Sequence, residues 1–224
     1  ERDDALKYKK YEENIKRCKA SILHKTIKDK ESESEENEKI IQSKPDMVFI
    51  VGDFFFYDDV DIFDSYLKPL STLAKNIPTY AVLGNHDYGI KSFNPYDVYK
   101  DEHTKIEYLL AQTGVHLLVN QSETVSIQGQ TIHLIGFNEL WVNRRSTEPL
   151  AVPLTFTDNF PRIVLTHNPD LIYDLPSGIV DLVLAGHTHG GQVRLPFVGP
   201  LGNAYTRLPR SAYQGLSEWN NNKL

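Results

Sequence analysis

The chain has little cysteine, no long apolar run and no excess of positive charge. Its single cysteine, Cys18, cannot form an internal disulfide, so the fold does not depend on an oxidising compartment. No stretch approaches the roughly 18 apolar residues that a membrane-spanning helix needs. The formal net charge of -6 gives no electrostatic basis for nucleic-acid binding, so no nucleic-acid partner is expected.

Charged residues of both signs are frequent up to about Pro45 and less frequent after it. Residues 1–44 are therefore interpreted as a charged helical and linker segment that precedes a domain over 45–224. Residues 3–23 are predicted to form a helix, and residues 28–42 a solvated loop that enters a short helix capped by Ser32 or Ser34. The chain begins with Glu1, as expected of a trimmed or processed product.

After Pro45, short apolar runs end in polar or glycine-rich turns. These runs are MVFIV (47–51) before Gly52-Asp53, TYAVL (79–83) before GNHD, RIVLT (162–166) before HNPD, and DLVLA (181–185) before GHTHGG. Their length and β-branched content predict buried strands. Helices are predicted over 59–76, bent or ended by Pro69, and over 101–114, closing at Gly114. Residues 116–137 are predicted to form consecutive antiparallel strands, so the fold class is α/β with mixed sheets.

The polar turns all follow strands, and in α/β sheets functional loops gather at the carboxyl ends of the strands. The side chains expected to meet there are Asp53, Asn85, His86, His167, His187 and His189. Carboxylate, amide and imidazole ligands together suit Mn, Fe or Zn. Two such ions, bridged by a carboxylate, form the arrangement that clamps the attacking and leaving oxygens in phosphoryl hydrolysis.

The four motifs resemble those of the calcineurin-like metallophosphoesterases in order, spacing and strand context. The segment AGHTHGGQVRLPFVGPL (185–201) further resembles a bacterial cell-envelope branch of this family, which includes membrane-associated phosphodiesterases and UDP-diacylglucosamine hydrolases. The match runs from about Lys44 to Leu201. It implies a four-layer α/β/β/α sandwich of two mixed sheets, with the metallophosphoesterase domain over 45–224. Against this family, the N-terminal and C-terminal parts look atypical or truncated, and residues 1–44 partly replace the usual first strand.

The resemblance also implies a role for each motif residue. Asp53 would bridge two divalent ions, Mn, Fe or Zn, with Asn85, His167 and His187 completing one site and His189 belonging to the other. His86 would donate a proton to the leaving oxygen or stabilise the transition state. A hydroxide that bridges the metals would attack phosphorus in line.

Two further segments are candidates for substrate contact. Arg194 follows the histidine turn closely and is a weak candidate for a substrate phosphate. The segment LWVNRR (140–145), with Trp141 beside two arginines, is interpreted either as a lid or phosphate clamp or as a solvated loop.

The family normally begins with a strand that ends in Asp-x-His, and this chain departs from that pattern. One alignment places ASILHKT there, so that His24 is a further candidate ligand and Ile22 stands in the Asp position. A second alignment uses Asp29 and Glu31, and a third possibility is that neither holds. An aliphatic side chain cannot ligate a cation, so one of the two metal sites would be short of ligands. In many relatives an Asp orients the proton-donating histidine, which corresponds to His86, and Phe56 stands in the place of that Asp here. Asp58, Asp59 and Asp87 are the candidate substitutes for it.

The first functional hypothesis is a metallophosphoesterase that hydrolyses a phosphomonoester or phosphodiester, with reduced or lost activity as one outcome of the missing ligand. The alternative is a protein of the same fold that binds one metal or a phosphorylated ligand with little turnover. The expected substrate is small and phosphorylated, or a lipid-linked phosphate. We expect a soluble bacterial protein, cytoplasmic or associated with the cell envelope, with peripheral membrane association as a further expectation.

Overall fold

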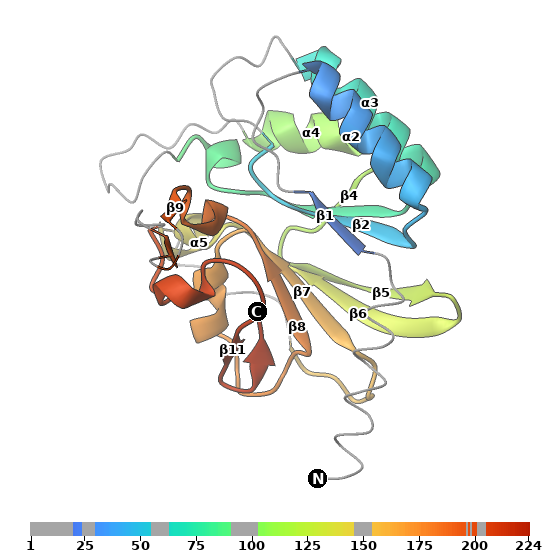
Figure 1. Cartoon of the computed structure of the whole chain (residues 1–224). Helices are drawn as coiled ribbons and strands as arrows, with labels where there is room; N and C mark the ends of the chain where they lie inside the picture. The colour runs from blue at the N-terminus through green and yellow to red at the C-terminus, as the bar shows by residue number, and fades with distance from the viewer. Residues whose placement is uncertain are drawn as a thin grey trace.

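The protein is built around two four-stranded sheets, shown by a computed structural model that describes residues 20–23, 30–54, 63–90, 103–145, 154–195, 197, 199–200 and 205–224 (Figure 1). The first sheet has the order β1 (Ala20–Leu23), β2 (Met47–Val51), β3 (Thr79–Val82) and β4 (His116–Leu117). The second has the order β5 (Gln121–Ile127), β6 (Gln130–Gly136), β7 (Arg162–Thr166) and β8 (Leu182–Ala185). The predicted α/β class is confirmed. The second sheet is mixed, because only β5 and β6 pair antiparallel, whereas the described strands of the first are all parallel.

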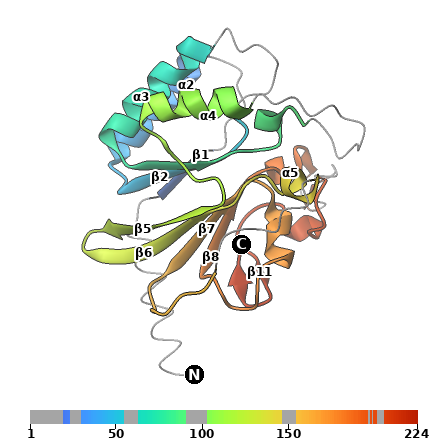
Figure 2. The same cartoon turned by 180° about the vertical axis from the view of Figure 1, so that it is seen from behind.

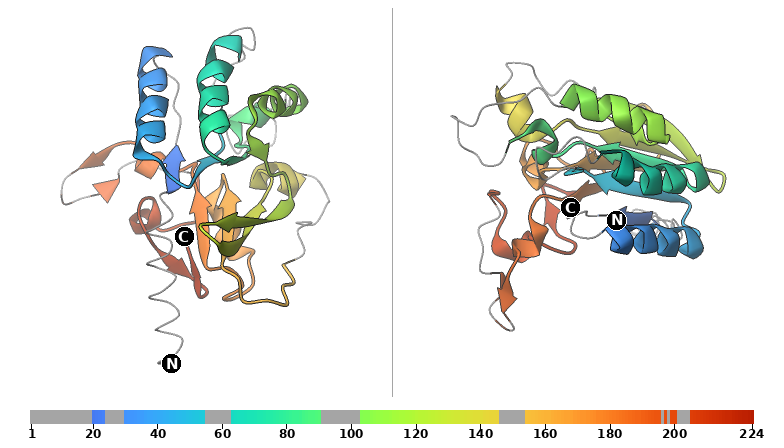
Figure 3. Two further views of the ribbon diagram at one scale, coloured as in Figure 1. Left: turned by 90° about the vertical axis from the view of Figure 1, so that its right-hand side faces the viewer. Right: turned by 90° about the horizontal axis from the view of Figure 1, so that it is seen from above.

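Three helices cover the outer face of the first sheet, and both opposed views place them on the side away from the second sheet (Figures 1 and 2). They are α2 (Lys30–Ser43), α3 (Phe63–Asn76) and α4 (His103–Thr113), which lie side by side (Figure 3). Alternate residues of β2, Val48 and Ile50, pack in one buried cluster with Leu70 and Leu73 of α3. The period of two along the strand therefore directs every second side chain toward the helices.

The other side chains of the same strands fill the space between the sheets. Met47, Phe49 and Val51 of β2 share a buried cluster with Leu134 of β6 and Leu165 of β7. Both faces of β2 are thus buried, which is why its sequence is a continuous apolar run rather than an alternating one.

The outer face of the second sheet is covered by short elements. Leu171 and Ile172 of η3 (Pro169–Tyr173) share a buried cluster with Val164 of β7 and Val183 of β8. The remaining short elements are α5 (Leu140–Arg145), the hairpin β9 (Arg194–Leu195) with β10 (Gly199–Pro200), η5 (Arg210–Ala212), and the hairpin β11 (Glu218–Trp219) with β12 (Asn222–Lys223). Four layers result, as the resemblance implied, with turns and a hairpin contributing to the fourth.

The four strands predicted from the apolar runs after Pro45 are present, and three other predictions need correction. Residues 20–23, predicted as helix, form β1 and pair with β2, while residues 3–19 lie outside the described part. Helix α2 already begins at Lys30, so residues 30–42 are not a loop and Ser32 and Ser34 lie inside the helix rather than capping it. β4 pairs parallel with β3 in the first sheet, not antiparallel with β5. The division at residues 44 and 45 stays a prediction.

Both predicted helices after Pro45 are present. Pro69 lies inside α3 without ending it, and the buried Leu70 and Leu73 hold this helix against the sheet. α4 ends at Thr113, and Gly114 follows with a φ of 87°. The helices in the described residues are too short or too polar to cross a bilayer.

The chain passes from the first sheet to the second through Leu118, which packs against Gly136 of β6. A Cβ atom at position 136 would lie 2.1 Å from Leu118 Cβ and 2.8 Å from its carbonyl oxygen. We expect Gly136→Ala to lower the free energy of unfolding by about 2–3 kcal/mol, because the overlap must push the sheets apart. Urea denaturation measures this change.

Gly129 is the matched control, because it lies in the turn between β5 and β6 with open space around it. Its φ of 78° makes Gly129→Ala cost about 1–2 kcal/mol through backbone strain alone. Equal or smaller destabilisation by Gly136→Ala would contradict the close approach of the two sheets.

Candidate metal centre

Four turns from the two sheets meet at one edge. β2 leads into Asp53, β3 into Asn85 and η2 (His86–Tyr88), β7 into His167, and β8 into His187 and η4 (His189–Gly191). The parallel pairing of these strands brings their carboxyl ends to the same side. The contacts described below unite four of the predicted ligands: Asp53, Asn85, His167 and His187.

His167 is fully buried and connects the two sheets. Its Nδ1 lies 2.6 Å from the carbonyl oxygen of Val51 at the end of β2. A carbonyl only accepts, so Nδ1 carries the hydrogen and the neutral ring presents a lone pair at Nε2. That Nε2 lies 3.2 Å from Oδ2 of Asp53 and 3.1 Å from Oδ1 of Asn85.

Asn85 is oriented by a backbone contact of its own. Its Nδ2 donates to the carbonyl of Ile90 at 2.6 Å, which turns the amide oxygen Oδ1 toward the two imidazoles. Nδ1 of His187 lies 3.0 Å from that oxygen and 3.3 Å from Nε2 of His167. Asn85 Oδ1 therefore contacts both histidines.

The convergence of these atoms fits a metal ion. The Asp53 carboxylate, the Asn85 amide oxygen and Nε2 of His167 are all acceptors, and acceptors repel one another unless a positive charge lies among them. Ligand atoms of a tetrahedral site with bonds of about 2.0–2.2 Å lie about 3.3–3.6 Å apart. The contacts among these side chains are 3.0 Å to 3.3 Å long, which is close to that spacing. Counting only His, Cys, Asp and Glu, no group of three or more described side chains has the spacing of a metal site. Such a count leaves out the Asn85 oxygen, which lies within 3.1 Å of nitrogens of both His167 and His187.

Burial and the charges of neighbouring side chains shift the pKa values of three of the candidate ligands. Burial alone would lower the pKa of His167, but the Asp53 carboxylate outweighs it and raises that pKa well above the ordinary value. Burial would raise the pKa of Asp53, and His167 together with His86 instead holds it well below its usual range. Burial and the adjacent His167 lower the pKa of His187 to about 3, so His187 stays neutral at neutral pH.

Close backbone approach makes this convergence possible. A Cβ atom at Gly52, whose φ is 84°, would lie 2.4 Å from the nitrogen of Gly84, and one at Gly84 would lie 2.2 Å from Oδ1 of Asp53. Three predicted ligands also have left-handed backbones: Asp53, His187 and His189, with φ of 59°, 65° and 49°. Such strain is typical of functional sites.

Fewer of the residues predicted for the second metal site lie in the described part of the chain. His189 is half-buried on η4. β1 places the backbone of Ile22 opposite Phe49 of β2, which favours the first of the two alignments, whereas His24 and Asp29 lie outside the described part. The Arg194 side chain also lies outside it.

A family model described as calcineurin-like phosphoesterase matches residues 23–191. The chain belongs to the calcineurin-like phosphoesterase family. The match covers all four motif turns and runs from the last residue of β1 to the end of η4. Divalent metals are characteristic of the family.

Several bacterial members of the calcineurin-like phosphoesterase family are similar to this chain. Phosphodiesterase YaeI of Escherichia coli is 33% identical over 159 residues, which are 71% of this chain and 54% of the relative. The metallophosphoesterase YkoQ of Bacillus subtilis is 29% identical, covering 80% of this chain and 64% of the relative. UDP-2,3-diacylglucosamine pyrophosphatase LpxG of Chlamydia trachomatis is 26% identical, covering 71% and 58%. The matched region thus spans between about half and two thirds of each relative.

Two buried carboxyl groups at the site were not among the predicted ligands. Oδ2 of Asp87 accepts from the backbone nitrogens of Asp53 at 2.9 Å and Gly84 at 2.8 Å, and so ties two motif turns together. Glu139 is fully buried, and burial raises its pKa to about 7 against the lowering effect of His167. The signal for Asp87 was its place in GNHD. Glu139 has no comparable signal, because only the fold brings the end of β6 to the site.

Residues 140–145 form the helix α5, which corrects the prediction of a solvated loop, while the alternative of a lid or phosphate clamp stays a prediction. Trp141 lies in α5 with an exposed fraction of 3%, which rules out a solvated position for its indole. The side chains of Arg144 and Arg145 lie outside the described part.

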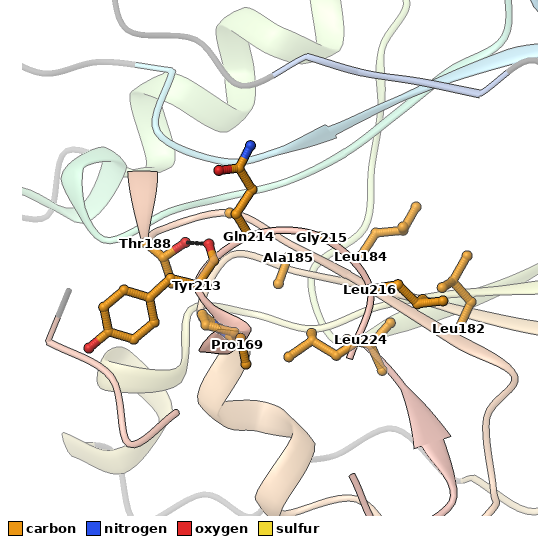
Figure 4. A pocket seen from close by; sticks show the side chains of 13 residues that line it. Pro169, Leu182, Leu184, Ala185, Thr188, Tyr213, Gln214, Gly215, Leu216 and Leu224 are labelled. Atoms are coloured by element: carbon orange, nitrogen blue, oxygen red, sulfur yellow. Dashed lines mark hydrogen bonds between the residues drawn. The ribbon is translucent and has the colours of Figure 1, made fainter. Parts of the chain in front are cut away.

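A cavity of about 320 Å³ lies beside β8, next to the histidine turn (Figure 4). Leu182, Leu184, Leu216 and Leu224 line one end, while the Thr188 hydroxyl donates to the carbonyl of Tyr213 at 2.8 Å at the other. None of the candidate metal ligands in the described residues lines this cavity. The hydrogen bond from Thr188 to Tyr213 fastens the turn that carries His187 and His189 to the C-terminal segment.

Asp87 gives a direct test of how the motif turns are held together. Asp87→Ala removes the acceptor for two buried backbone N–H groups, so we expect the free energy of unfolding to fall by about 2–4 kcal/mol. Asp87→Asn keeps an acceptor oxygen of the same reach and should lose less. Urea denaturation of the metal-free protein measures both variants, and wild-type stability of Asp87→Ala would contradict the assigned contacts.

Proposed function

We propose that this chain is a metal-dependent phosphoesterase that hydrolyses a phosphomonoester or phosphodiester. The observation that supports it best is the convergence of the Asp53, Asn85, His167 and His187 donor atoms, with the amide and the His167 ring oriented by their own backbone contacts. A structural histidine pair would not need acceptors aimed at one another. A cation explains the arrangement, and family membership supports phosphate esters as the substrates.

In this proposal Asn85, His167 and His187 would hold one divalent ion together with Asp53, and Asp53 would also contribute to holding a second. His189 serves that second ion, with His24 as the further candidate. When bound, ions such as Mn, Fe or Zn supply Lewis acidity toward phosphate oxygens and a nucleophile from water at neutral pH. The protein contributes the orientation: the Val51 carbonyl fixes the His167 ring, and Ile90 fixes the Asn85 amide.

His86 is proposed to donate the proton to the leaving oxygen. It begins η2 directly after Asn85, and its backbone nitrogen donates to Oδ1 of Asp53 at 3.1 Å. Its side chain is partly exposed, unlike those of Asp53, Asn85 and His167, which are buried. This placement leaves the imidazole accessible to a bound ester while its backbone stays fixed to the metal cluster.

The alternative is a metal-binding protein with little turnover. Ile22, at the end of β1, supports it, because an aliphatic residue in the place of an Asp leaves the second ion with fewer ligands. The first site is complete without that residue. One bound ion without hydrolysis is the signature of the alternative.

The relatives suggest the substrate class. One is a phosphodiesterase and another a pyrophosphatase acting on UDP-2,3-diacylglucosamine. We infer a small phosphorylated substrate or a lipid-linked phosphate, with peripheral membrane association in the lipid-linked case. Arg194, on β9 just after the histidine turn, is the candidate for a contact to the substrate phosphate. A bacterial location in the cytoplasm or at the cell envelope agrees with these relatives.

Metal content and hydrolysis test the proposed function together. We expect two metals per chain by mass spectrometry and Mn²⁺-stimulated cleavage of bis(p-nitrophenyl) phosphate. His187→Ala should reduce cleavage to the background rate, because it removes a ligand of the complete site. His133→Ala is the matched control, since His133 lies on β6 and contacts Thr124 and Asp158 instead. One metal with no turnover supports the alternative, and no bound metal contradicts both functions.

The role of His86 is tested with two leaving groups. We expect His86→Ala to keep its metal content and to lose about 100-fold to 10,000-fold in kcat for a methyl ester, whose leaving oxygen needs a proton. The loss should be much smaller for a p-nitrophenyl ester, which leaves without protonation. Equal losses for both esters would contradict proton donation and indicate transition-state stabilisation instead.

A further inference from the structure

The imidazole of His187 has an aromatic neighbour outside the metal cluster. The rings of His187 and Trp141 are perpendicular, with an interplanar angle of 88° and centroids 4.8 Å apart. On the cluster side, His187 meets His167 with centroids 5.2 Å apart and an angle of 80°. The His187 ring is thus held between a cluster ligand and the indole.

The second ring nitrogen of His187 explains why this contact matters. Nε2 is buried and, among the described residues, has no hydrogen-bond partner. A histidine that ligates a metal usually donates its other N–H to an acceptor, and that bond fixes the rotation of the ring. The described part of the chain offers no such acceptor, so the contact with the Trp141 ring is what can limit the rotation of the His187 ring.

Trp141 is in turn held by Glu139. Oε1 of Glu139 accepts from the backbone nitrogen of Trp141 at 3.1 Å, in the manner of an N-cap at the first turn of α5. The backbone nitrogen of Glu139 donates to Oδ1 of Asn138 at 2.7 Å, and the same oxygen accepts from the hydroxyl of Tyr88 in η2 at 2.5 Å. The first turn of α5 is therefore fastened to the motif turn that carries Asn85.

We propose that Glu139 and Trp141 are positioning residues for His187: the Glu139 carboxyl fixes the first turn of α5, and that turn holds the indole against the imidazole. The inference rests on the proposed function, in which His187 holds a metal. Neither residue reaches the reacting atoms. Their effect is to keep Nδ1 of His187 directed at the point where Asn85 and His167 also converge.

Metal titration of two substituted proteins tests this assignment. We expect Trp141→Leu and Glu139→Leu to weaken Mn²⁺ or Zn²⁺ binding by about 10-fold to 100-fold, the usual range for residues that orient a ligand. Excess metal should restore most of kcat for bis(p-nitrophenyl) phosphate, with KM for the ester unchanged. Glu139→Gln keeps an acceptor for the Trp141 nitrogen and should retain affinity near that of the wild type.

Leu140→Ala is the matched control, because Leu140 lies between the two residues and is buried in the cluster on the outer face of the second sheet. It should lower the melting temperature without changing metal affinity. In a His187→Ala background, Trp141→Leu should have no further effect on the affinity that remains.

The outcomes separate the two proposals. Wild-type protein that binds no metal would overturn the proposed function and this assignment together. Metal binding that Trp141→Leu leaves unchanged, or that Leu140→Ala weakens equally, would overturn the assignment alone. A loss in Glu139→Gln as large as in Glu139→Leu would show that charge acts rather than the hydrogen bond to α5, which also contradicts the assignment.

Discussion

The contacts of one buried imidazole, that of His167, constrain both the fold and the site. Its Nδ1 is bound to a backbone carbonyl of the first sheet although the residue follows a strand of the second, so the ring joins the sheets where their functional turns meet. The same bond determines which nitrogen faces Asp53 and Asn85. Acceptors then surround a lone pair, and a positive charge is needed among them. A proton on His167 meets that need at one atom, and a divalent ion held as proposed would meet it for all of the candidate ligands.

The backbone is strained where the ligands gather, and glycine makes that geometry possible. Side chains at Gly52 or Gly84 would overlap the opposite turn, and Asp53 and His187 have left-handed backbones that non-glycine residues seldom adopt. Strain of this kind persists only where surrounding contacts over-determine the structure. Here Asp87 supplies such contacts by binding the backbone of two motif turns, so stability and ligand geometry depend on the same hydrogen bonds.

Much of the fold could be predicted because its strands are short, apolar and followed by polar turns. β2 and β7 have the predicted bounds, since burial on both faces leaves an unbroken apolar run. The pairing of β4 could not be predicted, because two residues carry no periodicity and the crossing at Leu118 depends on packing against Gly136. Motif residues could be named because each follows a strand. Glu139 could not be identified in this way, since only tertiary structure brings it close enough to His167 for their charges to interact.

X-ray absorption spectroscopy of protein loaded with one equivalent of Zn²⁺ tests the metal centre most directly. The spectrum should show imidazole scattering from two histidines, with nitrogen and oxygen ligands at about 2.0–2.2 Å. His187→Ala should remove one of the two imidazoles, and Asn85→Ala should remove an oxygen and leave both. A spectrum without imidazole scattering, or one that His187→Ala leaves unchanged, would contradict the convergence of Asp53, Asn85, His167 and His187 on a single ion.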